Sequence, residues 1–265
     1  HAAHAPFRAE NSDHLALLRA HEGFRRAAAG GGGAARRWCE GAFISYTAME
    51  EVDASREQLA GALADAGFAA STAEAQRGAA GGVAAVHQAA LVRAIVVASL
   101  YPNLLQAREP DTKYMSTAAG AVASANDDSR LVKYYLAPKG GRAFLHPSSS
   151  LFGATGFECP WLVYGSKQII ARPGEPSPRV SVRNVTAASA YSLLLFGGDY
   201  SVQHAAQTVT IDGVVKLGVP PAVAALVREL RAALDAHLLK KLEDPAVDGG
   251  ALVDAVIGLI SKTKV

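Results

Sequence analysis

The spacing of hydrophobic residues changes twice along this chain. Before residue 111, apolar residues recur every three or four positions, which is typical of helices with one buried face. After residue 130 they form short alternating or β-branched runs, which favour strands, and helical spacing returns at Pro220. The pattern predicts an α+β fold. The expected helices cover residues 11–28, 39–67, 83–100, 220–244 and 251–260, and the expected strands cover 131–136, 142–146, 161–170, 180–185, 191–196 and 209–217.

Local signals mark the ends of these elements. Thr47-x-x-Glu50 has the form of a capping box, and Gly67 suits the end of the same helix. Asp212-Gly213 is a strong two-residue hairpin signal, because both turn positions want a positive φ. Pro220 and the proline after it favour the first turn of a helix.

The same pattern predicts the domain organisation. A helical domain is expected over residues 11–110, and a small polar segment over 111–129 reads as a linker or loop. Five or six short strands with turn signals over 130–219 favour a small barrel. Residues 220–265 are then C-terminal helices.

Composition narrows the class of protein only modestly. The 265 residues are 50% hydrophobic and 19% charged, with a net charge of +2. This balance is typical of a globular chain. Cys39 and Cys159 lie far apart without metal-ligand spacing, which favours free thiols in a reducing compartment. No run approaches the roughly 20 apolar residues of a membrane span, and no secretory signal is visible. We therefore expect an intracellular protein without a membrane partner.

One stretch resembles a known family. RAFLHPSSSLFGATGFECPWLVY, from Arg142 to Tyr164, is similar to the OB-fold of DEAH-box RNA helicases, and the Arg-Asn-Val-Thr of 183–186 continues the likeness. Asn11-Ser-Asp-His-Leu-Ala-Leu-Leu resembles the start of their helicase-associated helical domain. Leu-Tyr-Pro-Asn at 100–103 resembles a helix end of the family, with Ser99 in place of the usual glycine. These strings, in this order and spacing, extend the resemblance over nearly the whole chain. The Leu-Leu-Phe-Gly-Gly-Asp of 194–199 and the Leu-Val-Arg-Glu-Leu-Arg of 226–231 most resemble the RNA helicase A-like branch.

The resemblance implies a fold and a role. The fold would be a ratchet-like helical domain followed by a small OB-like β-barrel and C-terminal helices. The chain would be the RNA-binding and regulatory C-terminal region of an ATP-dependent helicase, guiding single-stranded RNA and coupling it to RecA-like motor domains. ATP and Mg²⁺ would belong to the parent helicase, and an activating protein partner is left open. The compartment would be the nucleus or cytoplasm, with an organelle equally open.

The motor itself is not encoded in this sequence. It contains neither a Gly-x-x-x-x-Gly-Lys-Ser/Thr phosphate loop nor an Asp-Glu-x-His string, so no ATP site is expected within it. A serine beside His146 does not make a catalytic triad, and no Gly-x-Ser-x-Gly elbow is present. We expect no catalytic residue, no metal site and no enzymatic activity of the chain alone.

Charge within the predicted barrel points to the candidate RNA contacts. Over residues 131–186 the only acidic residues are Glu158 and Glu175, so the local balance is positive. Basic side chains, the polar turn after residue 145 and one outward tyrosine suit phosphate, ribose and base contacts. The expected RNA-contacting residues are Lys139, Arg142, His146, Ser148, Ser149, Lys167, Arg172, Arg183 and Tyr135.

Purely structural roles for the same residues are the competing interpretations. The serines can simply cap a turn, basic residues usually lie on a solvated surface, and most aromatic residues would fill the barrel. Tyr134 and Tyr135 are adjacent, so one should point in and the other out. Two alternative functions remain open: a stand-alone protein-interaction module within a larger assembly, and a free-standing OB-type nucleic-acid binder.

Overall fold

The computed structural model of the chain describes residues 2–8, 11–73, 85–109, 114–117, 120–123, 132–138, 140–171 and 178–262. These residues belong to two compact units. One unit comprises His1–Arg8, Leu15–Val92 and Pro220–Lys264, and the other comprises Ala9–His14 and Arg93–Val219.

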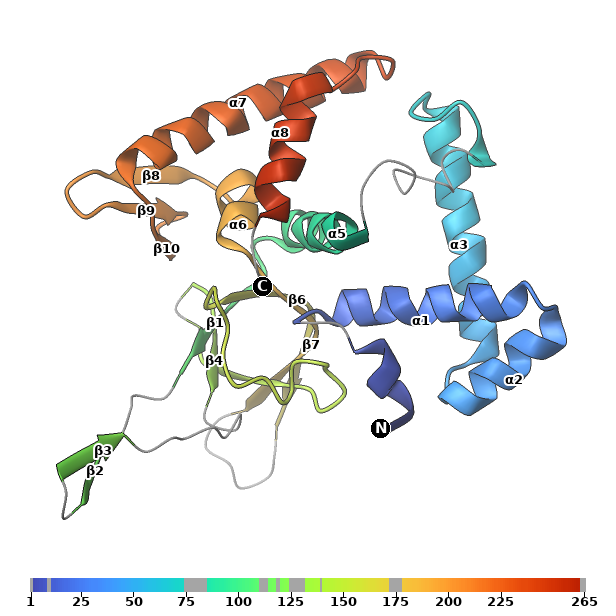
Figure 1. The fold of residues 1–265 in the computed structure, drawn as a ribbon, viewed down its shortest axis with the longest axis horizontal. Helices are drawn as coiled ribbons and strands as arrows, with labels where there is room; N and C mark the ends of the chain where they lie inside the picture. The colour runs from blue at the N-terminus through green and yellow to red at the C-terminus, as the bar shows by residue number, and fades with distance from the viewer. Residues whose placement is uncertain are drawn as a thin grey trace. The chain divides into compact units, whose positions relative to one another are not determined.

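The second unit is built around a closed five-stranded barrel, seen nearly end-on in Figure 1. Its strands follow one another around the barrel in the order β1-β4-β5-β7-β6. Four of the five neighbouring pairs are antiparallel, and β5 with β7 is parallel. The small barrel predicted from the sequence is confirmed. Its strands are β1 (Leu104–Arg108), β4 (Lys133–Leu136), β5 (Arg142–Leu145), β6 (Trp161–Ile170) and β7 (Arg179–Ala187).

Alternation along the strands fills the barrel with apolar side chains. Leu105, Leu162 and Val182 are fully buried and belong to one core cluster. Tyr134 belongs to the same cluster, and burial raises its pKa to about 12. Tyr135, the next residue, is only half-buried and lies outside the core cluster, so the expected in-and-out arrangement of the two tyrosines is confirmed.

A separate three-stranded sheet follows the barrel strands in sequence, and its strand order is β10-β9-β8. Asp212 and Gly213 turn from β9 to β10 with φ angles of 49° and 69°. Both values are positive, as the predicted turn requires, but the connection has three residues and not two, because Ile211 pairs with Val215. The single strand expected over 209–217 is therefore two strands. The three strands are β8 (Tyr200–Gln203), β9 (Thr208–Ile211) and β10 (Val215–Gly218).

The strand expected over 191–196 is wrong, because that segment is helix α6 (Ala190–Phe196). Ser189 caps the helix by accepting a hydrogen bond from the backbone N–H of Ser192 at 3.1 Å. The following leucines at 193–195 are all buried. A fully buried apolar run has no polar face, so its period does not distinguish a strand from a short helix.

The segment expected to be a linker contains structure. β2 (Tyr114–Thr117) and β3 (Gly120–Ala123) form an antiparallel two-stranded hairpin within it. The first barrel strand, β1, precedes this hairpin and was not predicted, because five residues before a change of period give too short a pattern to assign.

The described helices outside α6 follow the predicted pattern with two corrections. The single helix expected over 39–67 is two helices, α2 and α3, and Trp38 lies inside α2. Ser45, not Thr47, caps α3, since its Oγ accepts from the Ala48 N–H at 3.2 Å. The helical elements are η1 (Ala2–Phe7), α1 (Asp13–Ala28), α2 (Gly32–Ala42), α3 (Tyr46–Asp65), α5 (Ala85–Leu100), α7 (Pro221–Glu243) and α8 (Gly250–Ser261).

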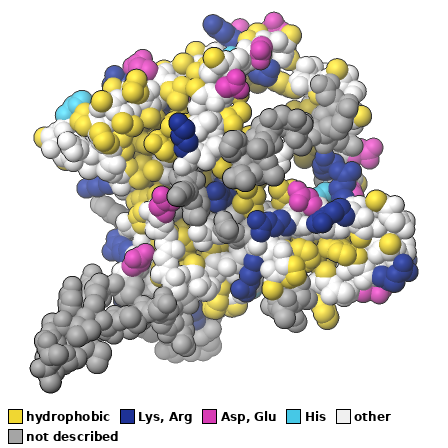
Figure 2. Space-filling view, in the orientation of Figure 1, with side chains coloured by type: hydrophobic (Ala, Val, Ile, Leu, Met, Phe, Trp, Pro, Cys, Tyr) yellow, Lys and Arg dark blue, Asp and Glu magenta, His cyan; other side chains and the backbone are white. Residues whose placement is uncertain are grey.

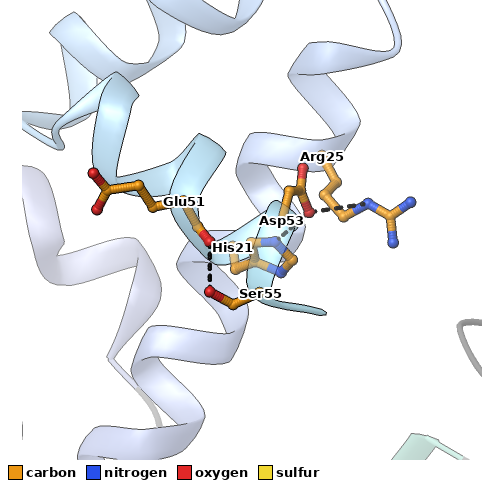
Figure 3. Close-up of polar contacts among 5 residues, drawn as sticks. All are labelled: His21, Arg25, Glu51, Asp53 and Ser55. Atoms are coloured by element: carbon orange, nitrogen blue, oxygen red, sulfur yellow. Dashed lines mark hydrogen bonds and ion pairs between the residues drawn. The ribbon is translucent and has the colours of Figure 1, made fainter. Parts of the chain in front are cut away.

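Polar and aromatic contacts hold α1 to its neighbours in the helical unit. His21 Nε2 of α1 lies 2.8 Å from Asp53 Oδ1 of α3, and the Arg25 Nε atom lies 3.9 Å from the same oxygen (Figure 3). Gly23 lies under the Trp38 ring of α2, where a Cβ would come within 2.6 Å of a ring carbon. A glycine is therefore required for α1 and α2 to approach this closely. Among the described helices, none has the length and apolar character needed to cross a membrane.

Candidate nucleic-acid interface

The outer surface of the barrel is defined by strand alternation. Because Leu105, Tyr134 and Leu145 face the core, their neighbours along each strand point outward. The strand register then aligns these outward residues, with Gln106 opposite Tyr135 and Tyr135 opposite Arg142. Residues far apart in sequence thus share one surface that crosses β1, β4, β5 and β7.

Cationic and aromatic side chains alternate across this surface. The Arg108 guanidinium carbon lies 4.7 Å from the centre of the Tyr135 ring. The Arg142 and Arg179 guanidinium carbons lie 4.9 and 3.9 Å from the centre of the Phe144 ring. We call these five residues the cation–aromatic ladder. Its members, in order across the strands, are Arg108, Tyr135, Arg142, Phe144 and Arg179.

The ladder has the chemistry of a nucleic-acid surface. Guanidinium planes and aromatic rings can both stack bases, and the guanidinium charges attract phosphate. Among the described residues, no carboxylate forms an ion pair with the arginines of the ladder. The whole chain has a net charge of only +2, and Figure 2 shows both basic and acidic side chains on the face in view. The positive character of the barrel is therefore local.

A second polar group, the rim cluster, lies where β5 ends. It consists of His146, Ser148 and Arg183. An Arg183 Nη atom lies 2.9 Å from His146 Nε2, and His146 Nδ1 lies 2.7 Å from Ser148 Oγ. Arginine can only donate, so His146 Nε2 is the acceptor in that contact. The Ser148 backbone N–H also donates to His146 Nδ1 at 3.2 Å, so both ring nitrogens are engaged within the cluster. The structure thus brings together three of the expected RNA-contacting residues.

The structure corrects the expectation that Ser149 lies on the RNA-contacting surface. Its side chain is 4% exposed, and its Oγ donates to Asp13 Oδ1 at 3.0 Å. Ser148 is exposed, whereas the next residue, Ser149, is buried. Ser149 therefore stabilises the turn from inside the protein and is not one of the surface contacts.

Lys167 does not lie with the residues of the rim cluster. It is exposed on β6 opposite Val182, whereas its neighbour Ser166 is opposite Arg183. Adjacent residues of a strand point to opposite sides, so Lys167 and Arg183 face different sides of the β6–β7 ribbon. The other two expected contacts, Lys139 and Arg172, lie outside the described residues.

The RNA-contacting residues expected from the sequence do not include three members of the ladder, which are Arg108, Phe144 and Arg179. Arg108 precedes the expected domain boundary, and Phe144 was expected to fill the barrel. The signal that could have found Phe144 is its position between core residues Ala143 and Leu145, because such a residue must point outward. No set of three histidine, cysteine, aspartate or glutamate side chains in the described part of the chain has the arrangement of a metal site.

The fold and this surface define a class of protein, the nucleic-acid-binding OB barrels, and comparison with known families agrees. Residues 92–200 match the oligonucleotide/oligosaccharide-binding (OB) fold. Residues 207–262 match the C-terminal domain found in RNA helicases.

Individual relatives identify the family. The chain is 31% identical over 94% of its length to a protein of Mycosarcoma maydis named as a DEAH-box ATP-dependent helicase. It is 29% identical over 89% of its length to the human ATP-dependent RNA helicase DHX29, and 28% over 94% to the human ATP-dependent DNA/RNA helicase DHX36. The chain spans only 17%, 16% and 23% of these relatives. It corresponds to the C-terminal region of DEAH-box ATP-dependent RNA helicases, as the sequence resemblance predicted.

Proposed function

We propose that this chain is the RNA-binding and regulatory C-terminal region of a DEAH-type helicase, and that its barrel guides single-stranded RNA along the cation–aromatic ladder. The observation that carries the proposal is the ladder itself: five alternating side chains from four strands, without an ion-paired carboxylate among the described residues. Stacking on such a surface tolerates any base, because every base has a π-face.

Within a helicase, this surface would hold RNA while RecA-like domains hydrolyse ATP. Those domains would be the partners that turn binding into movement, with ATP and Mg²⁺ bound by them rather than by this chain. Relatives that are named ATP-dependent helicases support this role. The chain by itself would bind RNA without hydrolysing nucleotide.

The test is a salt titration of single-stranded RNA binding, followed by fluorescence anisotropy. Each phosphate contact contributes about 0.7 to the slope of log K against log salt for a single strand. An Arg142→Ala/Arg179→Ala double variant should therefore lower the slope by about 1.4. The matched control, Arg228→Ala/Lys240→Ala, removes two exposed charges from α7 and should leave the slope unchanged.

Absence of RNA binding at low salt would overturn this proposal and favour a protein-interaction module. One observation supports that second function. Val52, Leu59 and Leu63 of α3 are 45–66% exposed and line a groove of about 640 Å³ together with Ala48 and Arg56. An apolar helix face of this kind suits a protein surface better than RNA.

A further inference from the structure

Asp13 lies at the start of α1, and its carboxylate accepts four hydrogen bonds from two distant parts of the barrel unit. Oδ1 accepts from Ser149 Oγ at 3.0 Å, from the Ser150 N–H at 2.6 Å and from Ser150 Oγ at 2.8 Å. Oδ2 accepts from the Val185 N–H at 2.8 Å. Asp13 itself is only 9% exposed. All four of these donors are uncharged, so this carboxylate depends on the geometry of the donors around it.

The two segments that Asp13 holds are those that carry the rim cluster. Ser149 and Ser150 directly follow Ser148 in the turn after β5, and Val185 lies two residues beyond Arg183 on β7. Between Arg183 and Val185, Asn184 has a φ of 54°, so the backbone bends at this point. One carboxylate therefore fixes both sides of the contact between His146 and Arg183.

The neighbouring residues extend this attachment along β7. Ser12 Oγ and His14 Nδ1 each lie 2.8 Å from Thr186 Oγ1, and the Ala187 N–H donates to the Asn11 carbonyl at 2.8 Å. The hydrogen bonds of Ser12 Oγ and His14 Nδ1 to Thr186 reach β7, whereas those of Asp13 also reach the turn. This difference separates Asp13 from the residues on either side of it.

We propose that Asp13 is a positioning residue for the RNA surface: it sets the geometry in which His146, Ser148 and Arg183 are presented. The inference rests on the proposed function for its RNA readout. A residue that only stabilised the fold would leave the His146 ring unchanged, whereas a positioning role predicts a change in the tautomer of that ring. The contacts of Arg183 with Nε2 and of Ser148 with Nδ1 together constrain the His146 ring to one tautomer, and releasing the turn from Asp13 would release that constraint.

The decisive variant is Asp13→Asn, which keeps the shape but puts an NH₂ donor against groups that themselves donate. In ¹⁵N spectra of the histidine rings, the wild-type His146 should show a single predominant tautomer, with the signal assigned by His146→Gln. In Asp13→Asn this signal should become a mixture of tautomers. RNA affinity should fall about tenfold, the loss expected when one charge-assisted contact is misplaced.

Ser12→Ala is the matched control, since it removes the buried hydrogen bond to Thr186 of β7 from the same segment. It should lower thermal stability but leave the His146 tautomer and the RNA affinity unchanged. Ser150→Ala removes only one donor to Asp13 and should show the effects of Asp13→Asn at reduced size. If Asp13→Asn fails to fold, Ser150→Ala tests the proposal in its place.

The outcomes are distinguishable. A folded Asp13→Asn or Ser150→Ala protein with an unchanged His146 tautomer would overturn the positioning role. So would a tautomer change in Ser12→Ala equal to that in Asp13→Asn, because the effect would then be general loosening. A tautomer change confined to Asp13→Asn and Ser150→Ala would support Asp13 as the residue that sets the rim geometry. If the wild-type chain bound no RNA in that case, only the proposed function would fail.

Discussion

The barrel and the helical unit distribute apolar and charged side chains in different ways. In the barrel, large apolar residues such as Leu162 are fully buried, and the outward positions hold arginines stacked on aromatic rings. In the helical unit, Leu59 of α3 and Leu242 of α7 are 66% and 68% exposed. On α7, Arg228 pairs with the adjacent Glu229 at 3.5 Å. The barrel is therefore the RNA-binding candidate because the arginines of its ladder lie beside aromatic rings and, among the described residues, form no ion pair with a carboxylate, and not because it has more charges.

The largest effect should come from opening a cavity in the barrel. Leu162→Ala should lower the free energy of unfolding by about 2–5 kcal/mol, because the lost side chain lies in a closely packed core. Leu59→Ala on α3 removes an exposed side chain and should change stability by no more than about 0.5 kcal/mol. Urea denaturation of the two variants measures the contrast. Equal losses would mean that the α3 face is buried in solution.

Phe144→Ala should affect binding more than folding. The ring supports two guanidiniums at the centre of the ladder, so its loss should weaken RNA binding by about 1–3 kcal/mol. The control is Phe43→Ala in the helical unit, where a phenylalanine is 72% exposed. Anisotropy titrations should show the loss for Phe144 alone. Similar losses for both variants would contradict a specific role of the ladder.

Gly23→Ala should disturb the helical unit and leave the barrel intact. The added Cβ would meet the Trp38 ring at 2.6 Å. Relieving such overpacking costs about 1–3 kcal/mol. Tryptophan fluorescence during denaturation should report the loss, with RNA affinity retained. Gly41→Ala on α2 is the control, since a Cβ there meets nothing within 4 Å. A large loss of RNA affinity in Gly23→Ala would show that the two regions are coupled.

The smallest effect concerns pH. Burial lowers the pKa of His14 from its ordinary value of 6.5, although the neighbouring Asp13 opposes this. Below that value the unfolded chain binds a proton more readily than the folded chain, so stability should fall as pH drops from about 7 through the folded pKa. His14→Gln should remove that part of the decline. Thermal denaturation from pH 7 to pH 5 measures the difference, and parallel curves would rule out His14 as a source.

The sequence was informative where structure depends on near neighbours. The bounds of β6, the Asp212-Gly213 turn and the proline-led start of α7 follow from strand period, turn chemistry and helix-capping rules. It was less informative where a role depends on distant residues. Ser149 looked like a surface serine because its partner, Asp13, lies 136 residues earlier. The ladder was incomplete for the same reason, since Arg108 and Arg179 meet their rings only through the strand register.

The parallel pairing of β5 with β7 has a kinetic consequence. These strands are not consecutive, so β6 and its turns must be synthesised before β7 can join β5. Pairing at such sequence separation is slow, because loop closure is completed before the contacts that stabilise it are formed. Arg179 and Arg183 both belong to β7. A nascent chain therefore acquires its complete ladder and rim only when the barrel closes, and until then it has no complete surface with which to capture RNA.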